Sequence, residues 1–135
     1  MDRMIEVELA RIIINETTDQ QFIYLREKKG GREFPIVIAI NEAFAIDRFV
    51  KEQAMPRPLT HELLFASITA LDARVARVEV TALRAGTFYA NLVLARDGAE
   101  VEVDARPSDA IALAVRSGAP LFAHEDVLEE LQARE

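Results

Sequence analysis

The chain begins with apolar and polar side chains that alternate with a period of two. Residues 5–9 alternate isoleucine, valine and leucine with glutamates, which predicts a strand with one buried face. Two more apolar runs, 22–27 and 34–40, predict a second and a third strand. The two glycines between these runs suit a hairpin loop. We therefore expect the first third of the chain to form antiparallel strands.

A helical period replaces this alternation after residue 40. Asn41 is expected to cap a helix that runs through Gln53. The residues expected to face inward are Ala43, Ile46 and Val50, and those expected to face solvent are Asp47, Arg48, Lys51 and Glu52. Two prolines then break the helix, and a second helix is expected over 60–71. This second helix is apolar nearly all round, which indicates burial in the core or in a subunit interface.

The middle of the chain is expected to form a three-stranded meander. The Asp-Gly pair at 97–98 favours a two-residue turn, and closing it pairs Leu94 with Val101. A two-residue turn at 85–86 would set apolar residues against polar ones across the preceding hairpin. A three-residue loop is therefore expected there, and it pairs Val78 with Leu94. One row on the other face then carries Thr81, Asn91 and Asp104.

The last third of the chain predicts a third helix, a short strand and a final helix. Ser108 is expected to cap the helix 109–117, and Gly118 is expected to end it. A strand over 120–123 and a helix over 125–134 follow. Antiparallel hairpins with helices between them are typical of the α+β class. No linker interrupts the pattern, so we expect one domain over residues 1–135.

Composition and charge narrow the function classes. The absence of cysteine excludes disulfides, thiolate catalysis and zinc–thiolate sites, and it fits a cytoplasmic location. No apolar run has the length of a membrane helix, and the start of the sequence lacks the pattern of a signal peptide. The formal net charge of −7 argues against tight, non-specific coating of nucleic acid, because such binding needs a basic excess. The basic residues near 26–32 and the acidic residues near 125–135 are expected to be solvated faces.

Two segments share a pattern, RPLTHELL from Arg57 and RPSDAIAL from Arg106. Each places Arg-Pro ahead of a hydroxyl residue and an acid where an apolar helix opens. Free backbone N–H groups at a helix start attract phosphate, and a planar guanidinium matches phosphate oxygens. The candidate phosphate ligands are therefore Arg57, Thr60, Arg106 and Ser108. The alternative is structural, with Thr60 and Ser108 as ordinary helix caps.

The same segments carry candidate catalytic groups. His61 lies in a first helical turn, where the helix dipole favours the neutral imidazole that a general base needs; the alternative is a packed histidine. Glu62, Asp104 and Asp109 are candidate ligands for Mg²⁺ or Mn²⁺, provided that the two segments meet within one subunit or across an interface. The candidate catalytic residues are His61, Glu62 and Asp109.

The segments RPLTHELL and VDARPSDAIALAVRSGAPLF resemble the bifunctional nuclease family, and the similarity extends from about residue 4 to 128. The resemblance implies an α+β fold that self-associates and a nuclease that cuts RNA and DNA. The family usually has aspartate after the histidine of the first segment. Glu62 keeps the carboxylate there but is one methylene longer. The positions that match the motifs are Arg57, Thr60, His61, Glu62, Asp104, Arg106, Ser108 and Asp109.

Two functions follow as hypotheses. The first is metal-assisted hydrolysis of phosphodiester bonds in RNA or DNA. The second is a non-enzymatic oligomeric module that binds an anion or organises a subunit interface. A homo-oligomer is expected in either case, because a small domain has few places to bury two helices, 60–71 and 109–117, that are apolar nearly all round.

Overall fold

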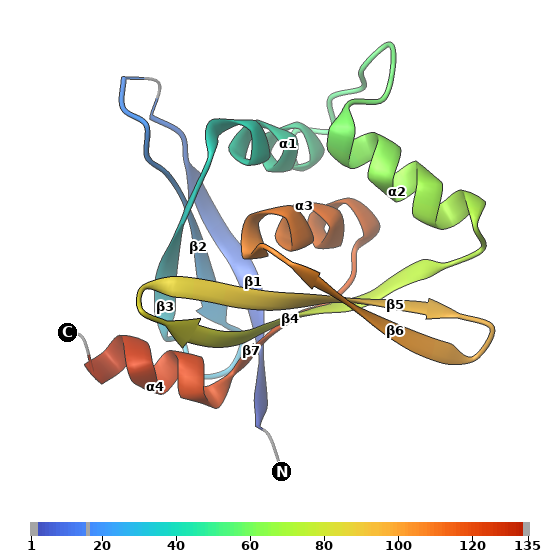
Figure 1. The fold of residues 1–135 in the computed structure, drawn as a ribbon. Coiled ribbons are helices and arrows are strands. Elements are labelled where there is room, and N and C mark those ends of the chain that lie inside the picture. The colour runs from blue at the N-terminus through green and yellow to red at the C-terminus, as the bar shows by residue number, and fades with distance from the viewer. Residues whose placement is uncertain (1–2, 16, 134–135) are drawn as a thin grey trace.

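The computed structural model describes residues 3–15 and 17–133, which form one sheet and its covering helices (Figure 1). The strands are β1 (Met4–Ile13), β2 (Gln21–Glu27), β3 (Glu33–Ile38), β4 (Arg74–Arg84), β5 (Thr87–Arg96), β6 (Ala99–Ala105) and β7 (Leu121–His124). The helices are α1 (Ile40–Val50), α2 (Thr60–Ala70), α3 (Pro107–Ser117) and α4 (Glu125–Ala133). The expected α+β class is confirmed. Residue 134, the predicted end of the last helix, lies outside the described residues.

The short strand β7 joins two antiparallel meanders into one sheet. The described strands follow the order β3-β2-β1-β7-β4-β5-β6. Strand β7 runs antiparallel to β1, where Leu121 pairs with Val7, and parallel to β4, where Leu121 pairs with Val78. The sequence predicts a strand here but not its place between the meanders. Leu121 and Ala123 of β7 are buried in the core, together with their partners Val7 of β1 and Val78 and Val80 of β4.

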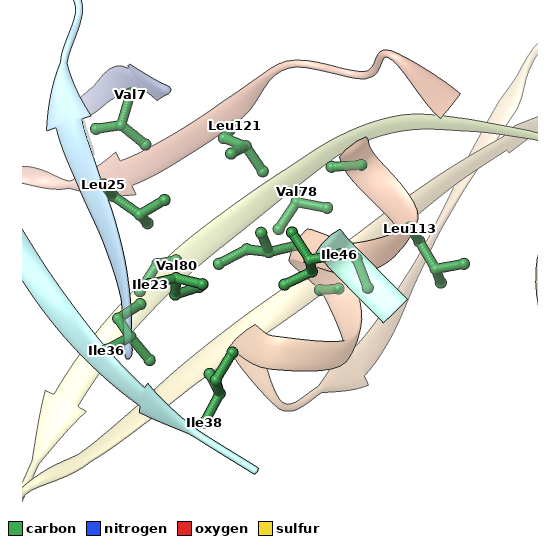
Figure 2. Close-up of a cluster of buried hydrophobic side chains, with 14 of the residues drawn as sticks. Val7, Ile23, Leu25, Ile36, Ile38, Ile46, Val78, Val80, Leu113 and Leu121 are labelled. Atoms are coloured by element: carbon green, nitrogen blue, oxygen red, sulfur yellow. The ribbon is translucent and has the colours of Figure 1, made fainter. Parts of the chain in front are cut away.

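Helix α3 lies at the centre of the core and contacts α1, α2, β4 and β5. Its alanines at 110, 112 and 114 are almost fully buried, and such small side chains let it approach its neighbours closely. Figure 2 shows apolar side chains of β1, β2, β3, β4 and β7 in one cluster with Ile46 of α1 and Leu113 of α3. Gly118 ends α3 in the left-handed conformation, with a φ of 77°, as predicted.

The first helix differs from its prediction at both ends. It begins at Ile40 after the extended residue Ala39, so Asn41 lies inside the helix and does not cap it. Packing of Ala43 and Ile46 against the core sets this start and overrides the capping signal. Val50, which was expected to face inward, is 56% exposed because the helix ends there.

The hairpin between β4 and β5 has a two-residue turn, so the predicted three-residue loop is wrong. Arg84 pairs with Thr87 across Ala85 and Gly86, whose φ angles of 51° and 81° are those of a tight hairpin turn. Val78 consequently pairs with Leu92 and not with Leu94.

A bulge explains how this turn remains compatible with the apolar pattern. The β4–β5 register shifts between Val80 and Ala82, so the extra residue Thr81 restores apolar pairs below the turn. The polar row on the other face is then Glu79, Asn91 and Asp104, with Glu79 in the place predicted for Thr81. The β5–β6 hairpin has the predicted register, with Leu94 opposite Val101.

The two apolar helices differ in their burial. Helix α3 is covered within the chain, whereas α2 buries Ile68 and leaves Leu63 57% and Leu64 43% exposed. The expectation that α2 is buried therefore fails within one chain, because α2 lies at the edge of the helical layer (Figure 1). No helix in the described part of the chain has the length and apolar character needed to cross a membrane.

The basic residues of the β2–β3 turn and the acidic last helix are not two separate solvated faces. Arg32 is 30% exposed and pairs with both Glu27 and Glu125; its Nη2 lies 3.1 Å from a carboxylate oxygen of Glu125. This pairing holds the start of α4 against the turn. It also leaves one fewer free positive charge on that surface.

Candidate functional site

The two Arg-Pro segments meet within one chain at a histidine–aspartate contact. Nε2 of His61, in the first turn of α2, lies 2.9 Å from Oδ1 of Asp109, in the first turn of α3. The sequence left open whether the segments meet in one subunit or across an interface. The His61 ring is nearly buried, so its position is fixed by the packing of α2 on α3.

Both residues line a groove of about 930 Å³, which we call the His61 groove. Helices α1, α2 and α3 and the strands β5 and β6 contribute to it, and much of its wall is apolar, including Leu92, Leu94 and Val103. Its polar lining includes Glu42, Thr60, His61, Asp104, Arg106 and Asp109. Most of the predicted site residues are thus gathered around one concave surface.

Arg106 binds the other carboxylate oxygen of Asp109. Its Nε and Nη2 donate to Oδ2 at 3.0 and 2.8 Å, so both oxygens of Asp109 are engaged. The hydrogen bonds and the charge of Asp109 raise the pKa of Arg106. Arg106 occupies the cap position of α3 and is 67% exposed, so it lies at the mouth of the groove.

Glu42 belongs to the same cluster, although the sequence did not indicate it. Its Oε1 lies 3.4 Å from Nη2 of Arg106 but accepts no hydrogen bond from the described residues. The residue is only 6% exposed, in the first turn of α1. An acid in a first helical turn is ordinarily a solvated partner of the helix dipole, so the sequence carried no signal for a buried role.

Glu62 has a different partner, Arg48 of α1. The guanidinium is bidentate, with Nε 3.1 Å from Oε2 and Nη2 3.3 Å from Oε1. Burial opposes ionisation of Glu62, but hydrogen bonds from Arg48 and the backbone, together with the charges of Arg48 and Arg116, lower its pKa. The prediction that Arg48 faces solvent is wrong, because the end of α1 packs beside the start of α2.

The hydroxyl residues and the remaining arginine occupy other positions. Thr60 opens α2 and lines the His61 groove, yet neither it nor Ser108 caps a helix through its side chain. Ser108 is buried inside the first turn of α3 and does not line the groove. Arg57 is exposed in the connection before α2 and lies outside the groove lining. The lining of the His61 groove therefore includes neither Arg57 nor Ser108.

Known proteins match most of this chain. The profile of the bifunctional nuclease domain matches residues 23–135. This chain belongs to the bifunctional nuclease domain family. Two uncharacterised proteins of Mycobacterium tuberculosis, from strains CDC 1551 / Oshkosh and ATCC 25618 / H37Rv, are each 39% identical to this domain over 125 residues. That alignment covers 93% of this chain and 74% of each relative.

The match supports a nuclease-related role at the level of the family, and it includes both Arg-Pro segments. The predicted metal ligands of this bifunctional nuclease domain do not assemble. No group of three or more histidine, aspartate or glutamate side chains is arranged to hold a metal ion in residues 3–15 and 17–133. Glu62 pairs with Arg48, and Asp109 with Arg106 and His61. Glu62, Asp104 and Asp109 therefore do not fit a shared divalent ion.

Proposed function

We propose that this domain cleaves phosphodiester bonds of RNA or DNA in the His61 groove, with His61 as the group that moves a proton. The observation that carries the proposal is the 2.9 Å contact between His61 and Asp109 in a concave site. A histidine oriented by a carboxylate is a common arrangement for general acid–base catalysis. The family assignment supports the choice of a phosphodiester as the substrate.

The contact determines which ring nitrogen of His61 is reactive. A carboxylate only accepts hydrogen bonds, so Nε2 carries the hydrogen that it donates to Asp109. Nδ1 is then the nitrogen that accepts a proton from an attacking water. The water oxygen bonds to phosphorus, the bond from phosphorus to the leaving oxygen breaks, and His61 returns the proton to that oxygen.

Arg106 has two roles in this proposal. Its Nε and Nη2 hold Asp109, whereas its Nη1 donates no hydrogen bond within the described structure. That free edge at the mouth of the groove suits a phosphate oxygen. The proposed step uses no metal ion, and two of the candidate carboxylates, Glu62 and Asp109, are paired with the guanidinium groups of Arg48 and Arg106.

The test is cleavage of fluorescent single-stranded RNA and DNA by the purified domain. His61→Ala is expected to lower the rate by about a hundredfold or more, whereas His124→Ala, which removes a histidine of β7, serves as the matched control. Cleavage is expected to persist in EDTA. Circular dichroism establishes that both variants are folded. Equal rates for His61→Ala and the wild-type chain would refute the proposal.

A non-enzymatic oligomeric module is the second candidate, favoured by the exposed leucines of α2. Leu63 and Leu64 form an apolar face that one chain leaves uncovered. We propose that a second copy covers this face. Light scattering coupled to size exclusion is expected to give a multiple of the mass of one chain, which Leu64→Lys reduces. A wild-type mass equal to one chain would refute self-association.

A further inference from the structure

A second pocket of about 680 Å³, which we call the Arg116 pocket, adjoins the His61 groove. It is formed by the end of α1, the connection 52–58 and the end of α3. Arg48 lines both cavities, and Glu62 lines this one directly after His61 in the chain. The Arg48–Glu62 pair therefore stands where the two cavities meet.

Two phenylalanines fix the guanidinium of Arg116 in this pocket. Its Cζ lies 4.3 Å from the ring centroid of Phe49 on α1 and 5.6 Å from that of Phe65 on α2. Contact between a cation and a ring face restricts the orientation of the guanidinium without neutralising its charge. The side chain is thus held in place before any ligand arrives.

The charge of Arg116 is not cancelled by an acid. Within residues 3–15 and 17–133, no carboxylate lies within ion-pair distance of its guanidinium, whereas Arg32, Arg48 and Arg106 each pair with at least one. Its charge does help to lower the pKa of Glu62, but both oxygens of Glu62 are held by Arg48. Glu52 is the other carboxylate in the pocket lining, on its exposed rim.

We propose that the Arg116 pocket binds a phosphate group of the nucleic-acid strand whose scissile bond lies at His61; the identity of the strand rests on the proposed function. A fixed guanidinium with free N–H groups matches the planar geometry of phosphate recognition. Arg48 lines both cavities, so a strand that leaves His61 along this wall of the groove enters the pocket beside Arg48. Arg116 is a binding residue in this proposal and does not touch the reacting atoms.

Fluorescence anisotropy tests the proposal with a labelled single-stranded RNA of about ten nucleotides. Arg116→Gln is expected to weaken binding roughly tenfold and to lower the dependence of affinity on salt by about one phosphate contact. Arg116→Lys keeps the charge but loses the planar guanidinium. Its affinity for the RNA is expected to lie between those of the wild-type chain and Arg116→Gln. Glu52→Gln is expected to strengthen binding slightly.

Arg11→Gln is the matched control. Arg11 also lies over an aromatic ring, 4.1 Å from the centroid of Tyr24, but it is on β1 and pairs with Glu33 at 3.1 Å. Equal losses for Arg116→Gln and Arg11→Gln would overturn the proposal, since both variants remove one positive charge. Thermal melting of all variants establishes that each is folded at the assay temperature.

Cleavage assays separate this proposal from the proposed function. If His61→Ala abolishes cleavage while Arg116→Gln binds RNA like the wild-type chain, the pocket proposal fails and the nuclease proposal stands. If the wild-type chain cleaves nothing but binds RNA through Arg116, the nuclease proposal fails and the pocket stands as a binding site. A dinucleotide substrate, which is too short to span both cavities, is expected to be cleaved equally by the wild-type chain and Arg116→Gln.

Discussion

The two Arg-Pro segments look alike in the sequence but differ in the structure. Helix α3 begins immediately after Arg106, so this arginine pairs with Asp109, three residues later on the same helical turn. Helix α2 begins at Thr60, three residues after Arg57, and Arg57 lies outside the groove. The acid of that segment, Glu62, is instead paired with Arg48 from another helix.

The comparison shows that the distance between the arginine and the helix start decides the role of the arginine. An arginine at the cap position lies beside the first-turn acid of its own helix and can pair with it. An arginine three residues before the helix is not held beside that acid. One segment therefore carries a local ion pair at the mouth of the groove. The other carries a long-range ion pair that ties α1 to α2.

The largest expected effect comes from breaking the long-range pair. Arg48→Ala leaves Glu62 with its charge in a site where its side chain is only 9% exposed. We expect a loss of roughly 2–3 kcal/mol in the free energy of unfolding, because an unpaired buried charge is costly. Denaturant titration measures it. Lys51→Ala, which breaks a solvated pair on the same helix, is the control and is expected to cost less than about 0.5 kcal/mol.

The next largest effect is expected from Asp109, the acid of the second Arg-Pro segment, on the rate of cleavage. Asp109→Asn keeps a side chain of similar shape beside His61 but lacks the charge that Arg106 holds and the purely accepting oxygens that fix the histidine hydrogen on Nε2. We expect cleavage to fall by about ten- to a hundredfold at neutral pH. Steady-state rates on fluorescent RNA measure it. An unchanged rate would mean that Asp109 does not orient the base.

The pH dependence of stability sharpens the comparison further. The pKa of Glu62 in the folded chain lies below its ordinary value of 4.5, so ionised Glu62 stabilises the fold above that pH. This stabilisation is lost as the pH falls through the lower folded pKa. The difference in melting temperature between the wild-type chain and Glu62→Gln should therefore shrink below pH 4.5. Because the glutamine of that variant does not titrate, a constant difference would contradict the assigned pairing.

The smallest effects are those of the two segment arginines on stability. Arg106 is largely exposed, so Arg106→Ala is expected to cost less than about 1 kcal/mol, as exposed ion pairs do. Arg57→Ala is expected to change the free energy of unfolding by less than about 0.5 kcal/mol, since the side chain is exposed. The melting temperatures of the two variants, each compared with that of the wild-type chain, measure these losses. A larger loss for Arg57→Ala than for Arg106→Ala would reverse the comparison.

The sequence predicts the parts of the fold that depend on local pattern. The strand alternation, the turn at Asp97 and the end of α3 at Gly118 are all read from neighbouring residues, and all three are confirmed. The turn at Ala85 was missed because the bulge at Thr81 compensates for it several residues away. No local signal marks such a bulge, since threonine is an ordinary strand residue.

The sequence predicts several residues of the candidate site but not which side chains contact one another there. His61 and Asp109 stand out because each follows an Arg-Pro pair at a helix start, and they do meet. Glu42 and Arg48 were missed because only tertiary packing decides that their side of α1 faces the other helices. Arg116 was missed because its two aromatic contacts come from α1 and α2, far away in the sequence.

The place of β7 between β1 and β4 has a consequence for how the chain folds during synthesis. Until Leu121–His124 leaves the ribosome, the two meanders expose unpaired edges at β1 and β4, and such edges favour aggregation. Pairing of Met4 with His124 closes a loop that contains nearly the whole chain, so the sheet has many contacts of long sequence separation. We therefore expect slow folding for a chain of this size, with the final strand as the step that completes the sheet.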